Sequence, residues 1–338
     1  MFKKFLIFTC FIIASISFLS CSKISDITDE MIDNPPAPIE KEEKYYSCYT
    51  GIECSKEESN RFAFMTIIEN SSAARPQSGI SYADILFETS AEGGIPRFLA
   101  LFSSNLPSVI GPVRSIRPYF IDIVKEFNIP VAHCGGSSEA LTTINNDSSI
   151  VSINEINQGS YFWRDSSRKA PHNLYTSSDN IKKYIDSKNI NITKSQFASF
   201  DENFFNDSNL QPASNIKLQI NKTYNTSYEY RNNVYYKFMN SEKAIDSIDN
   251  SQINFSNVVV QKTPITLSSD NCHLNIPIVG EGEGIVFSKG KMINIKWKRD
   301  SLDSKVTLLD KDGNIVPLSP GKTMWNIVDT KTKIEITK

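Results

Sequence analysis

The hydrophobic periodicity of the chain changes between residues 205 and 216, and this change constrains the fold more than any other feature. Before it, apolar runs alternate with a helical pattern in which Phe120, Ile123, Val124 and Phe127 are spaced i, i+3, i+4, i+7. After it, short aromatic and β-branched runs are separated by turn residues. We therefore expect an α/β layered domain at residues 60–205, with its strand order left open, and a mostly β domain at residues 216–335.

The apolar runs place the expected strands. In the first domain they cover residues 62–68, 84–89, 97–103 and 130–134, and in the second residues 228–230, 234–238, 258–260, 285–287 and 293–297. Pro118 suits the first position of a helix, and a second helix is expected around Ala140, Leu141 and Ile144. The turns at 288–291 and 310–314 suit hairpins. The glycine-rich stretch 280–284 lacks the context of a dinucleotide site and is expected to be a flexible loop or bulge.

The N-terminal residues have the pattern of an export signal. Lys3 and Lys4 precede an apolar run, Phe5 to Phe18, that is too short to span a bilayer but suits a signal peptide at residues 1–20. The run ends in Phe18-Leu19-Ser20-Cys21, which resembles the lipobox of bacterial lipoproteins. We expect Cys21 to be lipidated and to anchor the protein to a bacterial membrane outside the cytoplasm, since two acyl chains anchor stably. The alternative is an ordinary secreted protein in which Cys21 has no such role.

Residues 21–59 are expected to form a disordered tether after the lipidated cysteine. They contain Pro35-Pro36-Ala37-Pro38 and a charged run at 40–44, with few apolar side chains to bury. Cys48 and Cys54 lie in this polar segment and are a candidate disulfide outside the cytoplasm, although free thiols are equally expected.

Charge and residue counts exclude several classes of partner. From Cys21 onward the chain has 34 basic and 38 acidic residues, because only Lys3 and Lys4 are removed from the total, and no basic stripe indicates a nucleic-acid partner. Three histidines and the absence of a CxxC motif give no metal site, and we expect no cofactor.

Arginine is concentrated in the first domain of a chain that otherwise prefers lysine. Seven of the nine arginines lie between residues 60 and 170, with only two lysines. The guanidinium group binds carboxylate or phosphate in a bidentate way that lysine cannot copy. An anionic ligand is therefore one expectation, with candidate ligand-binding residues Arg75, Gln77, Arg97, Arg114, Ser115, Arg117, Gly135, Gly136, Ser137, Arg168 and Asn173. The equal alternative is that these arginines form internal ion pairs with Asp84, Glu88 and Glu92.

The same window contains residue types used in acid–base catalysis. The catalytic candidates are Glu88, Glu92, His133 and His172. His133 lies at the carboxyl end of an expected strand, where α/β sheets bind ligands, but it cannot pair with Cys134 because neighbours on a strand point to opposite faces. Ser137 is outside any G-x-S-x-G elbow, so a serine hydrolase is not expected.

Several motifs resemble one family in the same order along the chain. They are Ala74-Arg75-Pro76-Gln77-Ser78-Gly79, Glu92-Gly93-Gly94-Ile95-Pro96-Arg97-Phe98, Gly111-Pro112-Val113-Arg114-Ser115-Ile116-Arg117-Pro118, His133-Cys134-Gly135-Gly136-Ser137 and Ala170-Pro171-His172-Asn173-Leu174. Together with Lys296-Trp297-Lys298 and Leu318-Ser319-Pro320-Gly321-Lys322-Thr323-Met324-Trp325, they resemble the YerB-like lipoproteins, a two-domain family of unknown function. The resemblance implies a lipoprotein context and supplies no activity, cofactor or catalytic residue. Pro96 and Cys134 depart from the family pattern.

Three hypotheses follow from the residues. The first is a lipid-anchored envelope protein that binds an anionic ligand, such as a peptidoglycan fragment or an anionic polymer, through the arginine-rich face. The second is an enzyme that processes envelope glycan or a phosphoester with Glu and His and uses Arg to stabilise charge. The third is a scaffold for an envelope protein partner, with aromatics such as Tyr235 or Trp325 as anchors.

Overall fold

The computed structural model describes residues 43–338, and Lys44–Lys338 form one compact unit. The expected signal peptide at 1–20, the lipidation site Cys21 and the tether as far as residue 42 lie outside the described residues.

Residues 44–59 are folded, so the predicted tether is wrong for this part of the chain. They form strands β1 (Tyr45–Tyr46) and β2 (Glu53–Cys54) and helix α1 (Lys56–Ser59), which starts at a capping box of Ser55 and Glu58. The physical reason is Tyr49, which is buried with its ring centroid 6.1 Å from that of Phe127. Cys48 and Cys54 are free thiols, and Cys54 lies opposite Tyr45 in the hairpin, so the candidate disulfide is not formed.

The first half of the central sheet has the four strands that the apolar runs predict, together with a fifth that they do not. The predicted strands are β3 (Phe64–Ile68), β4 (Ile85–Thr89), β5 (Arg97–Phe102) and β6 (Val131–His133), and the additional one is β7 (Ser152–Asn154). Their order in the sheet is β4-β5-β3-β6-β7. β6 runs parallel to β3 and β7, whereas β5 is antiparallel to both β3 and β4. The expected α/β layer is confirmed, and its strand order is now known.

Three helices accompany these strands: α2 (Pro118–Phe127), α3 (Ser138–Asn146) and α4 (Ser178–Ser187). α2 begins with Pro118 at its first position, as predicted, and its expected apolar face is buried. Ser137 and Ser177 cap α3 and α4, with their side chains accepting from backbone N–H groups of the first turn.

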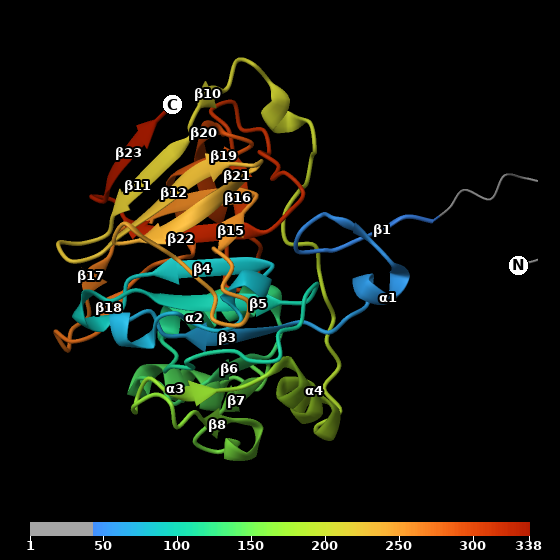
Figure 1. The fold of residues 1–338 in the computed structure, drawn as a ribbon, viewed down its shortest axis with the longest axis vertical. Coiled ribbons are helices and arrows are strands. Elements are labelled where there is room, and N and C mark those ends of the chain that lie inside the picture. The colour runs from blue at the N-terminus through green and yellow to red at the C-terminus, as the bar shows by residue number, and fades with distance from the viewer. Residues whose placement is uncertain (1–42) are drawn as a thin grey trace, which may run out of the picture. The chain divides into compact units, whose positions relative to one another are not determined.

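The second half is mostly β, as expected, and it extends the same central sheet. Strands β16 (Asn257–Thr263), β19 (Gly280–Ser288), β20 (Lys291–Arg299), β21 (Thr307–Leu309), β22 (Thr323–Asp329) and β10 (Gln211–Pro212) bring that sheet to 11 strands. β22 pairs in parallel with β4, so the two sequence halves share one continuous sheet (Figure 1).

A second sheet of six strands packs beside it. It contains β11 (Asn215–Gln219), β12 (Asn225–Arg231), β13 (Val234–Met239), β14 (Glu242–Lys243), β15 (Asn254–Phe255) and β23 (Lys333–Thr337). Short pairs complete the fold: β8 (Trp163–Arg164) with β9 (Leu174–Tyr175), and β17 (Thr266–Leu267) with β18 (Leu274–Asn275).

Alternate residues of the central strands face two separate cores. Phe64 and Ile68 of β3 join the core shared with the six-stranded sheet and α4, and Met65 and Ile67 join the core covered by α2 and α3. Trp325 and Tyr235, proposed above as partner anchors, are buried in these cores. The scaffold hypothesis therefore loses both of its named anchors.

The glycine-rich stretch 280–284 is the start of strand β19, not a flexible loop or bulge. A Cβ on Gly282 would lie 2.7 Å from the indole nitrogen of Trp297, and one on Gly284 would lie 2.6 Å from the carbonyl oxygen of Val260. Glycine is needed here because neighbouring atoms approach the backbone closely, which periodicity cannot reveal.

Candidate functional site

The parallel strands of the first half end at one edge of the central sheet, which we call the carboxyl edge. β3, β4, β6 and β7 share a direction, so the residues that follow them meet there. Polar residues follow each of these strands at this edge. They are Glu69 and Asn70 after β3, Glu92 after β4, Cys134 after β6 and Glu155 after β7. Open α/β sheets bind ligands at this kind of edge.

Glu92 holds two of the predicted arginines. Arg117 Nε donates to Glu92 Oε1 over 2.6 Å, and Arg97 Nη2 lies 3.4 Å from Oε2. Arg97 also donates to the carbonyl oxygen of Ser115. Burial would raise the pKa of Glu92, but the hydrogen bond from Arg117 and the two positive charges hold it below its ordinary value. Glu92 is therefore a partly buried counter-ion rather than a general acid, and its predicted pairing with arginine is found.

Glu69 is a member of the site that sequence reasoning missed. His172 Nδ1 lies 2.8 Å from Glu69 Oε1, which also accepts from Ser71 Oγ over 2.7 Å. Arg114 Nε lies 3.5 Å from Glu69 Oε2. A carboxylate directly after a buried strand, in the same window as the arginines, is the pattern that would have pointed to Glu69.

Gly135 and Ser137, which were candidate ligand-binding residues, use their backbone N–H groups inside the protein, so the prediction of an anion site at Gly135–Ser137 is wrong. The Gly135 N–H donates to Asn154 Oδ1 over 2.8 Å, and the Ser137 N–H donates to the Ile116 carbonyl oxygen. Gly136 pairs with Ile116 in an isolated parallel bridge. These glycines let the loop that carries Arg114 and Arg117 lie against the end of β6.

His133 is also in the wrong place for the proton shuttle predicted for it. It is fully buried, with Nδ1 2.8 Å from the Gly135 carbonyl oxygen and Nε2 2.7 Å from Ser152 Oγ. Burial lowers the pKa of His133 to about 4, which keeps the ring neutral. Both ring nitrogens are used inside the protein, so His133 is a structural residue.

Arg168 and Asn173 hold a surface loop together. Arg168 Nη2 donates to the Pro76 carbonyl oxygen over 2.6 Å, and Nη1 donates to that of Ala73. Asn173 accepts from Arg164 Nη1 and donates to the carbonyl oxygens of Asp165 and Arg168. Arg168 thus bridges the loop before β9 to the loop that carries Arg75.

Arg75 lies at one wall of a groove of about 360 Å³. Its Nε donates to Asn70 Oδ1 over 3.1 Å, its Nη2 donates to the Asn70 carbonyl oxygen over 2.7 Å, and its guanidinium lies over the ring of Tyr224. Within residues 43–338, no carboxylate is placed in an ion pair with it. The groove is lined by Ser72, Arg75, Pro76, Gln77, Met239, Glu242, Lys243 and Ile245.

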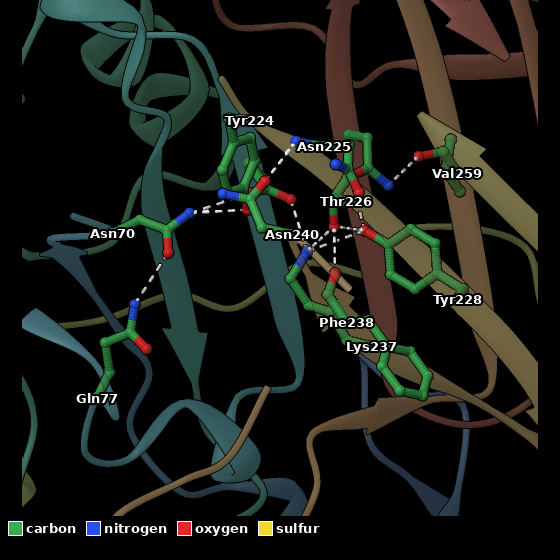
Figure 2. Close-up of polar contacts among 12 residues, drawn as sticks. Asn70, Gln77, Tyr224, Asn225, Thr226, Tyr228, Lys237, Phe238, Asn240 and Val259 are labelled. Atoms are coloured by element: carbon green, nitrogen blue, oxygen red, sulfur yellow. Dashed lines mark hydrogen bonds and ion pairs between the residues drawn. The ribbon is translucent and has the colours of Figure 1, made fainter. Parts of the chain in front are cut away.

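Asn70, which binds Arg75, belongs to a buried polar network of which Figure 2 shows a part. Asn70 bridges Gln77 to Tyr224, accepting from Gln77 Nε2 and donating to the Tyr224 hydroxyl. The Asn70 amide and the Tyr224 hydroxyl also both donate to Glu88 Oε1, over 3.2 and 2.5 Å. Arg75 is therefore held by residues from both sequence halves.

Glu88 pairs with a lysine from the second half instead of with an arginine, and its burial excludes the predicted catalytic role. Lys237 Nζ donates to Glu88 Oε2 over 2.7 Å, and both side chains are buried. Lys237 also donates to Thr226 Oγ1 and to the hydroxyl of Tyr228. Burial lowers the pKa of Lys237, whereas Glu88 acts in the opposite direction.

Asp84 is the third predicted partner of an arginine, but within residues 43–338 no arginine forms an ion pair with it. It lies at the opposite end of β4, where Oδ2 accepts from the Ser104 N–H over 2.8 Å. Oδ1 has no hydrogen-bond partner among the described residues. Burial raises the pKa of Asp84 to about 6, against the hydrogen bonds from Ser104 and the charge of Lys322.

We predict that Asp84→Asn stabilises the protein increasingly as the pH rises from about 4 to 6. Because the folded-state pKa lies above the ordinary 3.8, the folded protein binds more protons than the unfolded chain across this window, and its stability falls as the pH rises. At ~1.36 kcal/mol per pKa unit, ionised Asp84 costs roughly 3 kcal/mol, of which asparagine removes a part. Urea unfolding of both proteins at several pH values measures the difference.

Burial also raises the pKa of Asp122 to about 6, so Asp122 contributes to the pH dependence of stability as well. The difference in stability between wild type and Asp84→Asn isolates the contribution of Asp84, because Asp122 is present in both proteins. Asp147→Asn is a control of opposite sign. The hydrogen bond from Lys125 lowers the pKa of Asp147 to about 2, so its stabilising effect is lost as the pH falls below the ordinary value. A difference between Asp84→Asn and wild type that stays constant with pH would contradict the assignment.

The fold and site together define a two-domain protein in which one mixed sheet carries an arginine-rich polar edge, braced by a buried ion pair between the domains. The chain belongs to the DUF3048 family. Residues 49–191 match the model described as "Protein of unknown function (DUF3048) N-terminal domain", and residues 215–325 match that of the C-terminal domain. The resemblance to the YerB-like family and the expected two-domain fold class are thus confirmed.

A curated protein and a solved structure, both of YerB from Bacillus subtilis, are similar to this chain. One, named "Putative lipoprotein YerB" (strain 168), is 30% identical over 297 residues, which cover 86% of this chain and 88% of the relative. The other is the crystal structure of YerB protein, with a TM-score of 0.77 and 29% identity, covering 86% of this chain and 100% of that one.

From residue 43 onward, no helix has the length and apolar character needed to cross a membrane. In the same range, no three His, Cys, Asp or Glu side chains are grouped to hold a metal ion.

Proposed function

We propose that this protein is a lipid-anchored component of the bacterial cell envelope that binds an anionic envelope ligand through the arginine-rich polar edge. The anchor is Cys21, which follows an apolar run in a lipobox-like sequence. The name of the YerB relative, a lipoprotein, supports this context. The ligand class is a peptidoglycan fragment with free carboxylates or an anionic polymer with phosphates.

One observation carries the binding proposal: the guanidinium of Arg75 lines a groove, and within residues 43–338 its hydrogen bonds go to neutral oxygens of Asn70. Its ordered partners hold it in one orientation, and Lys243 lines the same groove. An arginine without a paired carboxylate keeps its charge available for a ligand, and its planar fork accepts two oxygens of one anionic group. By contrast, Arg97 and Arg117 are already paired with Glu92.

We predict that Arg75→Lys weakens binding of the anionic ligand about tenfold, because the positive charge remains while the fork is lost. Calorimetric titration of the purified full-length protein with a muropeptide, and separately with poly(glycerol phosphate), measures the affinity and distinguishes the two ligand sources. Arg231→Lys is the matched control, since Arg231 also lies over a tyrosine ring, that of Tyr236, but outside the groove. Equal affinities of wild type and Arg75→Lys for both probes would refute the proposed contact.

A further inference from the structure

We propose that Glu69 and His172 form a second site at the carboxyl edge, a general acid–base pair that hydrolyses a phosphodiester of an anionic envelope molecule. This activity goes beyond ligand binding at Arg75. It depends on different side chains, so either proposal can fail without the other.

The pair has the geometry that orients a catalytic imidazole. Glu69 Oε1 lies 2.8 Å from His172 Nδ1, and the Glu69 side chain is only 6% exposed, whereas that of His172 is 27% exposed. An ionised carboxylate only accepts hydrogen bonds, so Nδ1 carries the proton and Nε2 is left as the acceptor. No hydrogen bond within residues 43–338 occupies His172 Nε2, which is therefore available to a substrate.

The carboxylate is itself held on two sides. Ser71 Oγ donates to Glu69 Oε1 over 2.7 Å, and Arg114 Nε lies 3.5 Å from Oε2. Ser71 Oγ lies on the Nδ1 side of the imidazole, at 3.4 Å, and not beside Nε2. Its place is thus to fix Glu69, and the nucleophile is a water molecule at Nε2.

Two arginines, one beside Glu69 and one in the loop of His172, favour an anionic substrate. The Arg114 side chain is 29% exposed beside Glu69, so part of its guanidinium can reach a bound group. Arg168 lies four residues before His172 in the same loop, and among the described residues its guanidinium donates to backbone carbonyl oxygens. A phosphodiester carries one negative charge and develops a second during attack, which arginine stabilises.

The reaction balances as a hydrolysis. A water oxygen bonds to phosphorus while its proton passes to His172 Nε2, and Glu69 stabilises the imidazolium that forms. The bond between phosphorus and the leaving oxygen breaks, and its electron pair stays on that oxygen. The imidazolium then returns the proton to the leaving oxygen, so the products are an alcohol and a phosphomonoester. His172 is the catalytic residue in this scheme and Glu69 is a positioning residue.

The test is turnover of bis(4-nitrophenyl) phosphate and of poly(glycerol phosphate) by the purified full-length protein. We expect wild-type turnover, and a loss of about a hundredfold or more in His172→Gln, the usual contribution of general acid–base catalysis. Glu69→Gln is expected to lower kcat about tenfold or more at an unchanged KM, because it removes the charge that stabilises the imidazolium. The pH profile should lose its acidic limb in His172→Gln, which a purely structural role would not change.

The chain supplies a matched control in His273. Its Nδ1 lies 2.5 Å from Asp270 Oδ2, which makes a second carboxylate–histidine pair. This pair is more exposed and lies in a turn outside the arginine-rich edge. We expect His273→Gln to keep wild-type turnover of both substrates. Wild-type release of nitrophenolate at the buffer rate, or a loss in His172→Gln of less than about tenfold, would overturn the proposal.

Discussion

Lys237→Met is expected to lower the free energy of unfolding by about 3–5 kcal/mol, because it leaves the carboxylate of Glu88 buried without its counter-ion. The ammonium group of Lys237 lies 2.7 Å from Glu88 Oε2, and both side chains are almost completely buried. The remaining donors to Glu88, Asn70 and Tyr224, are neutral and cannot compensate for the lost charge. Urea unfolding at neutral pH, with the slope on denaturant checked for constancy, gives the value.

The double variant Glu88→Gln, Lys237→Met separates the ion pair from its surroundings. Removing both charges should recover most of the lost stability, since replacing a buried pair together costs much less than breaking it. The exposed pair of Lys296 and Glu281, at 2.7 Å, is the control, and Lys296→Met should change stability by less than about 1 kcal/mol. If Lys237→Met were no more destabilising than Lys296→Met, the buried pair would not brace the two domains.

Trp325→Ala is expected to cost about 3–5 kcal/mol and to keep a single unfolding transition for both domains. Trp325 is buried on β22, the strand that joins the C-terminal half to β4, and its ring packs on Phe87 and Phe197. Its indole N–H donates to Gln261 Oε1 over 2.8 Å, so truncation both leaves a cavity and deprives Gln261 of a donor. Calorimetry together with tryptophan fluorescence measures the loss and tests whether the probes coincide.

Trp163→Ala is the matched control for the tryptophan. Trp163 is 37% exposed in the short strand β8, so less contact area is lost and the expected change is well below that of Trp325→Ala. If the two domains of the Trp325→Ala variant unfolded in separate transitions, β22 would not couple them. Because β22 and β4 are hydrogen-bonded neighbours in one sheet, we expect one transition.

The candidate site illustrates where prediction from sequence works and where it stops. Composition located the arginine-rich window, and the structure brings Arg97, Arg114 and Arg117 to one edge with Glu92 and Glu69. Which arginines are paired could not be predicted, because pairing depends on distances across loops far apart in the chain. The expected roles of Glu88 and His133 failed because both side chains are buried.

Glu69 shows the other kind of omission. It is one residue beyond the buried strand β3, a position that indicates the edge of the sheet but not which group its carboxylate contacts. The chain returns at His172, 103 positions later, and places an imidazole against its carboxylate. Likewise, Lys237 follows the alternating pattern of β13 and would be taken for an ordinary strand residue, yet it meets Glu88 149 positions away.

The sequence by itself determined the elements of this protein: the α/β pattern of the first half, the β strands of the second and the arginine-rich window. These follow from periodicity and from residue type, which act over a few residues. Only the tertiary structure decided that β22 pairs with β4 in one sheet, that Lys237 neutralises Glu88, and that Glu69 orients His172. The reason is that strand order, burial and ion pairing depend on contacts between distant segments, and a single local pattern is compatible with many such arrangements.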